Sequence, residues 1–388
     1  MDNIDYYYYK SKLNLSLPDN YQVPAFIEKS FSNCGGTAYC IKVLLKKIQD
    51  TIKKFEEEII WQDQTRILLS ELASTLPPII NSMEKINSEK LQIVKNSNER
   101  FQRYHNYFNI NETAGMDVTL LAKQDAEVLY WMICEMKDIA MDEFEIINFL
   151  NAATIRWNFF IQILYAECTN EMDIPEENQA IAIKNPRIDN SQEATSFFRW
   201  FICHYDFAFN TIHAKYQITN CLKNFKEKNY EVVAHAINNA GILIRGTSAD
   251  LVFSSKFPRV IYQNVIRPSM GLGFTGKDNP QWSSFSESLE QLINLVVAYE
   301  IPVVVEKALK NFLENYLQDI EVHVWVAAKQ VGSKPSLTQE EINEYLEKDM
   351  KNDRPATEDL RTLHYVRLKK FEFLEAYKIL YSLFNKKK

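Results

Sequence analysis

The segment from Phe257 to Pro280, FPRVIYQNVIRPSMGLGFTGKDNP, gathers unusual residue types around one arginine. It holds three of the chain's nine glycines, Gly271, Gly273 and Gly276, all shortly after Arg267. A guanidinium at the rim of a pocket can bind a carboxylate through two parallel hydrogen bonds. Glycines allow the following backbone to approach a ligand closely. The segment therefore favours a carboxylate site, although an arginine that faces solvent or a neighbouring carboxylate would have the same sequence.

Two prolines predict the local structure of this segment. Pro258 is tolerated in the first turn of a helix, and Pro268 disfavours helical geometry in the residue before it. We therefore expect a short helix from Phe257 to Arg267, with Arg267 at its end, where a cation also suits the helix dipole. The glycines after Pro268 predict a loop that can fold over a ligand.

A second candidate is the histidine in EKALKNFLENYLQDIEVHVWVAAKQVG. Apolar residues at helical spacing place His323 on the apolar face of this predicted helix. The face consists of Leu309, Phe312, Tyr316, Ile320, His323 and Ala327. A lone histidine on such a face is often satisfied by a carbonyl or hydroxyl group. It can also be the single axial ligand that a haem requires, whereas a zinc site would need further ligands.

Helical periodicity dominates the elements that must position these residues. A long amphipathic run covers 42–76, and further helices are expected at 118–137, 142–167, 193–224, 229–246, 284–299 and 303–331. Three irregular stretches interrupt them: 170–193, the glycine segment after Arg267, and GSKPS from Gly332. Thr338 and Glu341 stand at capping-box spacing and predict a short helix after GSKPS. We expect an all-α fold with a smaller N-terminal helical part, 1–112, and a helical body, 113–388, that encloses a ligand pocket.

Composition excludes several classes of function. A formal net charge of −7 argues against a nucleic-acid partner, which would need a basic face. The apolar runs are interrupted by polar residues, and no secretory signal is visible, so we expect a cytoplasmic protein without a membrane partner. Neither GxGxxG nor GxxxxGK[ST] occurs, and the six cysteines form no CxxC pair. The 46% of hydrophobic residues and 13% of aromatic residues are ample for a large core or a flat-walled pocket.

Several segments, in the same order along the chain, resemble the indoleamine 2,3-dioxygenase-like haem proteins. PRVIYQNVIRPSMGLGFTGKDNP is similar to the segment of that superfamily in which a helix carries aromatic residues and an arginine before a glycine-containing loop. VIYQNVIRPSM also resembles a stretch of monodechloroaminopyrrolnitrin synthase, a relative of those dioxygenases. FFRWFICHYDFAFNTI is similar to the helix on the distal side of the haem, and YLQDIEVHVWVAAKQV to the helix that presents the proximal histidine.

The resemblance implies a role for five residues. His323 would be the axial ligand of the haem iron, and Arg267 would bind a substrate carboxylate. Tyr262 and Gln263 would line the substrate side, with Gln263 at a position where another aromatic residue is usual. Phe201 would lie over the distal face, where a small hydroxyl residue is common in the superfamily.

Two further departures concern the spacing and the loop. The interval from Arg267 to His323 is shorter than in the dioxygenases. DRPATEDLRTLHYVR takes the place of their mobile glycine-rich loop and lacks its glycines, so closure over the substrate would differ.

Taken together, the residues and the resemblance predict a haem-dependent oxygenase. We expect a small aromatic substrate, an aromatic amino acid or an indole-like compound, and O2 at a His-ligated haem, in a protein that can form oligomers. One alternative is a helical non-haem iron oxygenase that uses Glu231, His235 and further carboxylates. The other is a non-enzymatic helical protein in which the run from Ile41 to Leu76 binds a partner helix.

Overall fold

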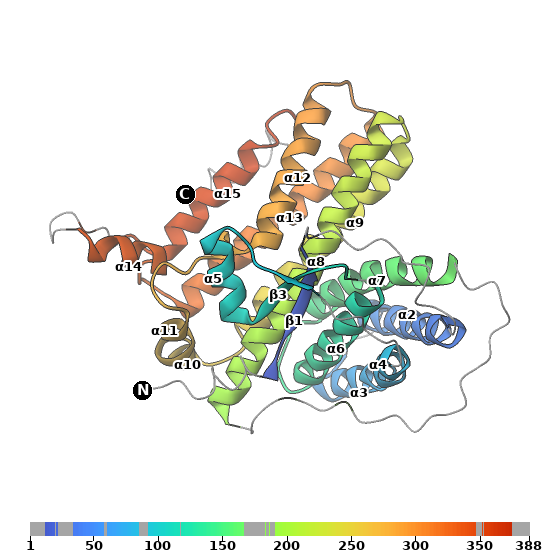
Figure 1. The fold of residues 1–388 in the computed structure, drawn as a ribbon, viewed down its shortest axis with the longest axis horizontal. Helices are drawn as coiled ribbons and strands as arrows, with labels where there is room; N and C mark the ends of the chain where they lie inside the picture. The colour runs from blue at the N-terminus through green and yellow to red at the C-terminus, as the bar shows by residue number, and fades with distance from the viewer. Residues whose placement is uncertain are drawn as a thin grey trace. The chain divides into compact units, whose positions relative to one another are not determined.

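The fold is known from a computed structural model, which divides the chain into two compact units, Met1–Phe209 and Asn210–Lys388 (Figure 1). The structure describes residues 12–19, 21, 34–57, 60–84, 92–116, 118–166, 183, 186, 191–346, 351 and 353–374. Most of the irregular stretch expected at 170–193 lies outside the described residues. The all-α fold is confirmed, because helices make up nearly all the regular structure of the described chain. The expected division into 1–112 and 113–388 stays a prediction.

The first unit consists of helices around an apolar core. They are α2 (Cys34–Glu57), α3 (Gln62–Ala73), α4 (Leu76–Glu84), α5 (Glu99–Phe108), α6 (Val118–Met136), α7 (Glu143–Ala166) and the first part of α8 (Gln192–Lys226). The α2 helix packs against α7 and α4, and α6 packs against α3 and α4. The amphipathic run predicted at 42–76 is therefore two main helices rather than one. The second begins after Trp61, whose backbone N–H donates to the Gln64 side chain at 2.9 Å.

A small sheet in the first unit was not expected from the sequence. Its order is β1 (Leu15–Pro18), β3 (Ile110–Ala114), β2 (Gln92–Val94), with β1 parallel and β2 antiparallel to β3. Leu15 pairs with Ile110, and Val94 pairs with Glu112. Strands of three to five residues are too short to produce a readable alternation, which is why helical periodicity alone was visible.

A buried cluster of charges joins three helices of the first unit. Arg156 on α7 contacts Asp125 on α6 at 2.8 Å and Asp206 on α8 at 2.7 Å, and all three side chains are fully buried. Burial raises the pKa of Asp125 to about 6; Arg156 opposes this rise, and Asp206 adds to it. The cluster therefore keeps two carboxylates next to one guanidinium, all three without exposure to bulk solvent.

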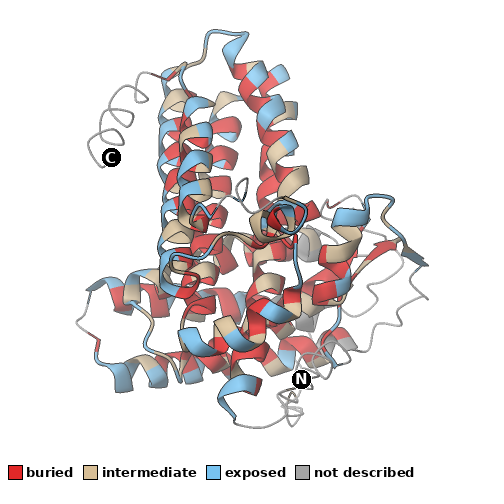
Figure 2. Cartoon of the chain, turned by 90° about the vertical axis from the view of Figure 1, so that its left-hand side faces the viewer, coloured by how far each residue is buried: buried red, intermediate tan, exposed pale blue. Residues whose placement is uncertain are grey.

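The second unit is a helical bundle around α13 (Val303–Gln330). The α13 helix packs against α9 (Tyr230–Ser254) and α15 (Ala356–Lys369), and α12 (Pro280–Val297) contacts it through aromatic rings. Gly241 on α9 allows this closeness, because a Cβ there would lie 3.0 Å from the Asn315 side chain. The buried residues lie on the inward faces of these helices (Figure 2). The helices expected at 284–299 and 303–331 are confirmed, and the one expected at 229–246 continues to Ser254.

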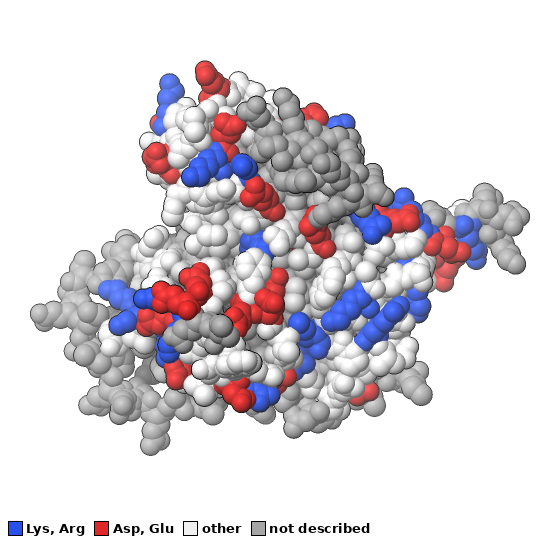
Figure 3. All heavy atoms as spheres, turned by 180° about the vertical axis from the view of Figure 1, so that it is seen from behind, with Lys and Arg blue, Asp and Glu red and all other residues white. Residues whose placement is uncertain are grey.

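Two observations concern membrane and nucleic-acid partners. None of the described helices combines the length and the apolar character that a membrane-spanning helix needs. On the face drawn in Figure 3, both acidic and basic side chains are present, and uncharged stretches separate the charged groups. The Lys386–Lys388 end of the chain lies outside the described residues.

Candidate functional site

Arg267 lies in a continuous helical segment of the second unit that changes its register. The segment begins with α10 (Arg259–Ile261), widens into the π-helical turn η2 (Tyr262–Ile266) and ends with α11 (Arg267–Met270). The backbone N–H of Arg267 donates to the carbonyl of Tyr262, five residues earlier. Such wide turns inside helices are frequent at functional sites.

The prediction that Arg267 ends the helix is wrong. Arg267 has helical backbone angles, φ −57° and ψ −46°, and the helix continues through Pro268 to Met270. In a regular α-helix Pro268 would interrupt a bond to the carbonyl four residues earlier. In the preceding turn, the backbone N–H of Arg267 already donates to the carbonyl five residues earlier instead of four. Pro268 therefore follows a turn whose hydrogen bonds are no longer those of a regular α-helix.

The glycines after Arg267 allow contact with a second short helix, α14 (Leu337–Glu344). Gly271 ends α11 with φ 76°, and Gly273 has φ 74°, a conformation that L side chains rarely adopt. The backbone N–H of Gly273 donates to the carbonyl of Leu337 at 3.0 Å, and a Cβ on Gly273 would clash with the Glu341 carboxylate. In the structure the expected loop is therefore packed against α14.

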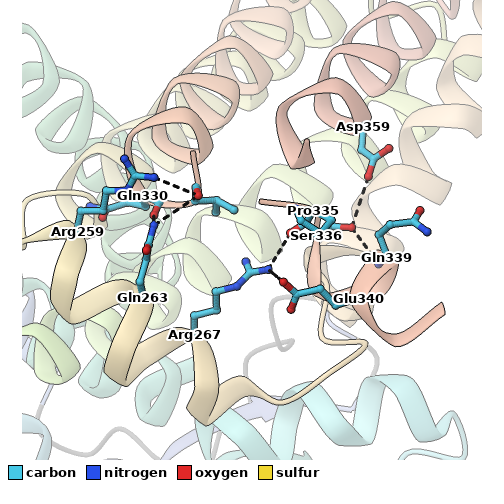
Figure 4. Close-up of polar contacts among 10 residues, drawn as sticks. Arg259, Gln263, Arg267, Gln330, Pro335, Ser336, Gln339, Glu340 and Asp359 are labelled. Atoms are coloured by element: carbon cyan, nitrogen blue, oxygen red, sulfur yellow. Dashed lines mark hydrogen bonds and ion pairs between the residues drawn. The ribbon is translucent and has the colours of Figure 1, made fainter. Parts of the chain in front are cut away.

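The Arg267 guanidinium is bound to a carboxylate of the protein itself. Its Nη2 donates to the carbonyl of Pro335 at 2.7 Å and to Glu340 Oε1 at 2.9 Å (Figure 4). The Arg267 side chain is 8% exposed, whereas the Glu340 side chain is 31% exposed. The sequence left open whether Arg267 binds a ligand carboxylate or faces solvent or a carboxylate of the protein. In the structure it faces a carboxylate of the protein, Glu340 on α14.

The short helix expected after GSKPS is confirmed, although its cap is not the predicted one. The N-cap of α14 is Ser336, whose hydroxyl accepts from the backbone N–H of Gln339 at 3.2 Å. Thr338 lies inside the helix, so the spacing of Thr338 and Glu341 does not form a capping box. The cap fixes the first turn of α14, which carries Glu340 (Figure 4).

The two other residues predicted beside Arg267 lie in the wide turn η2. Tyr262 is half-buried; burial raises the pKa of its hydroxyl, and a hydrogen bond with Arg267 and the charge of that residue oppose the rise. Gln263 donates to the carbonyl of Gln330 at 3.1 Å, at the end of α13. The turn therefore holds Tyr262 against Arg267 and fastens Gln263 to the helix that carries His323.

His323 is half-buried on α13 and is not hydrogen-bonded to any residue that the structure describes. The carboxylate of Asp319, one turn earlier, is already occupied by Thr247 Oγ1 at 2.9 Å and by Arg367 Nη1 at 2.8 Å. Burial lowers the pKa of His323; the charge of Arg367 lowers it further, and Asp319 opposes both. The ring is therefore neutral near pH 7 and has a nitrogen lone pair to offer.

The surroundings of His323 are partly polar and partly apolar. The charges of Asp319 and Arg367 act on its ring, whereas its sequence neighbours Val322, Val324 and Val326 are apolar and only partly covered. A neutral imidazole can serve as the axial ligand of a haem. The end of α13 is about 10 Å further along the helix, where Gln330 contacts the Arg267 segment.

Other features of the second unit are separate from these residues. A surface pocket between α12 and the end of α15 is lined by Glu290, Ile293, Asn294, Val297, Lys369, Lys370, Glu372 and Phe373. Neither His323 nor Arg267 lines it. Glu231 and His235, the ligands considered for a non-haem iron, are exposed on α9. Within the described ranges, no three His, Cys, Asp or Glu side chains are grouped closely enough to hold a metal ion.

Phe201 lies in the first unit, on α8. Its ring is fully buried and stacks on Tyr107, with ring centroids 6.0 Å apart, and meets Phe108 edge-on at 5.6 Å. The structure thus places Phe201 in an aromatic cluster of that unit. Its predicted place over a haem face stays a prediction.

Sequence reasoning missed three charged residues of the second unit: Glu340, Asp319 and Arg367. Glu340 is 73 residues from Arg267 along the chain, so no spacing could reveal their contact. Arg367 belongs to the segment expected in place of a mobile loop, but residues 356–369 form α15. The absence of glycine from that segment was the available signal for a helix.

Comparison with known proteins gives one match. The family model described as SfmD 3-methyl-L-tyrosine peroxygenase matches residues 51–308, about two thirds of the chain. No curated protein and no solved structure matches. The family is a haem peroxygenase family of the indoleamine 2,3-dioxygenase-like superfamily, so the resemblance expected from the sequence is confirmed. The matched residues include Phe201, Tyr262, Gln263 and Arg267, and they end before His323.

Proposed function

The chain belongs to the SfmD 3-methyl-L-tyrosine peroxygenase family, and from this premise we propose that it is a haem-dependent enzyme that oxidises an aromatic amino acid. The peroxygenase activity by which the family is described favours a peroxide as the oxidant over the O2 expected from the sequence. Transfer of one oxygen atom from hydrogen peroxide to the aromatic ring would leave water as the second product. When bound, haem would supply this redox chemistry.

The chain's own residues would hold the cofactor and orient the substrate. We assign His323 as the axial ligand and Arg267 as the group that binds the substrate carboxylate. Tyr262, which lies against Arg267, would line the substrate side together with Gln263, and Phe201 is proposed for the distal side. Because these groups would fix the position of the aromatic ring, they would lower the entropic cost of the reaction.

The observation that carries this proposal is the state of His323. A neutral, half-buried imidazole without a hydrogen bond to the described residues supports ligation of an iron porphyrin. The main rival is His213 on α8, which is fully buried and lies inside the residues that the family model matches. The two histidines can be tested side by side.

The test is the visible spectrum of protein produced with a haem supply, for the wild type and three alanine variants. We expect a Soret band that is lost or strongly shifted in His323→Ala and retained in His235→Ala, which removes an exposed histidine. Addition of imidazole should restore the band in His323→Ala. An unchanged band in His323→Ala, together with loss in His213→Ala, would transfer the ligand role to His213. Absence of haem from the wild type would overturn the proposed function.

The oxidant is tested separately. The haem-loaded protein is incubated with 3-methyl-L-tyrosine and either hydrogen peroxide or O2 with a reductant, and the products are analysed by mass spectrometry. We expect addition of a single oxygen atom with peroxide. Ring cleavage with O2, which adds two oxygen atoms, would instead support the dioxygenase chemistry expected from the sequence.

A further inference from the structure

The ion pair between Arg267 and Glu340 raises a question of charge. If a substrate carboxylate bound Arg267 alone, it would compete with Glu340, and a partly buried carboxylate would lose its partner. Glu341, the next residue, adds a second negative charge, and its carboxylate lies over Gly273. A ligand that brings only a carboxylate therefore meets, at Arg267, a cation that is already paired with the Glu340 carboxylate.

An α-amino acid solves this problem, because its carboxylate and its ammonium group are attached to the same carbon atom. We propose that Arg267 and Glu340 together bind the zwitterionic head of an α-amino acid: the carboxylate contacts Arg267 and the ammonium group contacts Glu340. The inference rests on the proposed function and adds to it a residue that determines specificity. No charge is left unpaired when a zwitterion is inserted into an existing ion pair.

The geometry of Arg267 allows such an insertion. A guanidinium carries five N–H groups, and the bonds to Pro335 and Glu340 both come from Nη2. An incoming carboxylate can therefore use other N–H groups while the Pro335 carbonyl keeps the side chain in place. Tyr262, which is hydrogen-bonded to Arg267, lies beside the position that the carboxylate would take.

The exposure of Glu340 indicates the side from which the ligand enters. Its side chain is 31% exposed, against 8% for Arg267, so the carboxylate is the accessible partner of the pair. The helix that carries it is held from two directions: the Ser336 cap fixes its first turn, and Gly273 donates to Leu337. The backbone that carries Glu340 is thus held independently of the contact between Glu340 and Arg267.

Two simpler roles for Glu340 make different predictions. If it only occupies Arg267 in the absence of substrate, its removal should strengthen binding of every ligand that has a carboxylate. If it only supports the fold, its removal should weaken all ligands alike. Three probes separate these cases: 3-methyl-L-tyrosine, the same molecule without its ammonium group, and the same molecule without its carboxylate.

The experiment measures dissociation constants of the three probes by calorimetry, on haem-loaded wild type, Glu340→Gln and Arg267→Gln. We expect Glu340→Gln to weaken the amino acid and the amine about 10- to 100-fold, and to leave the propionate analogue unchanged or tighter. Arg267→Gln should weaken the amino acid and the propionate analogue and spare the amine. Glu344→Gln, an exposed position on the same helix, is the matched control and should change no probe more than about threefold.

The outcomes distinguish the inference from the proposed function. If Glu340→Gln tightens the amino acid and the propionate analogue equally, or weakens all three probes equally, the ammonium role of Glu340 is overturned while the proposed function stands. If the wild type binds no aromatic amino acid, both are overturned. Far-UV circular dichroism and the haem content of each variant show that the fold is intact.

Discussion

Two arginine–carboxylate pairs in the second unit have the same chemistry and different surroundings. Arg367 on α15 binds Asp319 at 2.8 Å and also donates to the Tyr316 carbonyl at 3.1 Å; its guanidinium lies 4.4 Å from the Tyr316 ring and 4.8 Å from the Trp282 ring. Both members of this pair are sealed, with side-chain exposures of 6% for Arg367 and 4% for Asp319. Arg267 is similarly buried, but its partner Glu340 is open to solvent.

The exposure of the carboxylate separates an ion pair that only supports the fold from one that can bind a ligand. Removing one member of a sealed pair leaves a buried charge without compensation, so the pair belongs to the fold. When one member is accessible, water or a ligand can compensate the charge that remains, and the pair can exchange partners. Arg156 in the first unit is the sealed extreme, since neither it nor its two aspartates are exposed.

The largest effect is expected at Arg156. Arg156→Met leaves Asp125 and Asp206 buried without a cation, and should lower the free energy of unfolding by about 5 kcal/mol. Urea-induced unfolding followed by tryptophan fluorescence measures this loss. The triple variant that also carries Asp125→Asn and Asp206→Asn should recover at least half of it. A loss below about 1 kcal/mol in the single variant would show that the cluster is not sealed.

The second largest effect is expected at the sealed pair of the second unit, Arg367 and Asp319. Arg367→Met leaves Asp319 with Thr247 as its one hydrogen-bond partner among the described residues and removes the contacts with two aromatic rings. We expect a loss of about 3–4 kcal/mol in the same measurement. Arg361→Met, at an exposed position of α15, should stay within about 0.5 kcal/mol of the wild type. Equal losses in the two variants would contradict the structural role of Arg367.

The next effect is a dependence on pH. The ordinary pKa of an Asp carboxyl is 3.8, and burial raises the pKa of Asp125 to about 6. Between these values the folded chain retains a proton that the unfolded chain has released, so the free energy of unfolding falls as the pH rises. The contribution of Asp125 falls by up to about 3 kcal/mol between pH 4 and 6.

Urea titrations at several pH values test this dependence. Asp125→Asn cannot titrate at this position, so its stability should vary less between pH 4 and 6 than that of the wild type. Parallel curves for the two proteins would mean that Asp125 is ionised throughout this window in the folded chain.

The smallest effect is expected at the open pair. Glu340→Gln should change the free energy of unfolding by less than about 1 kcal/mol, because water can solvate what remains of a partly exposed pair. The same urea titration gives this value and allows direct comparison with Arg367→Met. A loss as large as that of Arg367→Met would end the distinction between the two pairs and count against the exchange of partners at Arg267.

The sequence was sufficient for the helices and for the positions of the main candidates. Apolar residues that recur at helical spacing predicted α6, α7, α8, α12 and α13 closely, because each of these helices runs for many turns. His323 and Arg267 stood out because a histidine on an apolar face and an arginine before three glycines are unusual. Their proposed roles came from the resemblance.

The interaction partners of these residues could not be predicted from the sequence, for physical reasons. Contacts such as Arg267 with Glu340 and Arg367 with Asp319 join residues 73 and 48 positions apart. They depend on how helices pack, which leaves no local pattern. The wide turn before Arg267 was also missed, because the rule for proline assumes a regular helix and the chain had changed its register one turn earlier.

That wide turn has a consequence for the direction in which Arg267 points. Each residue of an α-helix turns the chain by about 100° about the helix axis, so a single extra residue between Arg259 and Arg267 acts as an angular spacer. Arg259 Nη2 donates to the carbonyl of Val331 and Gln263 to that of Gln330, so this segment is anchored at the end of α13. In a regular helix with the same anchors, Arg267 would be turned by about 100° from its present direction, away from Glu340. The one extra residue in this wide turn thus sets the direction of Arg267 at the proposed amino-acid site.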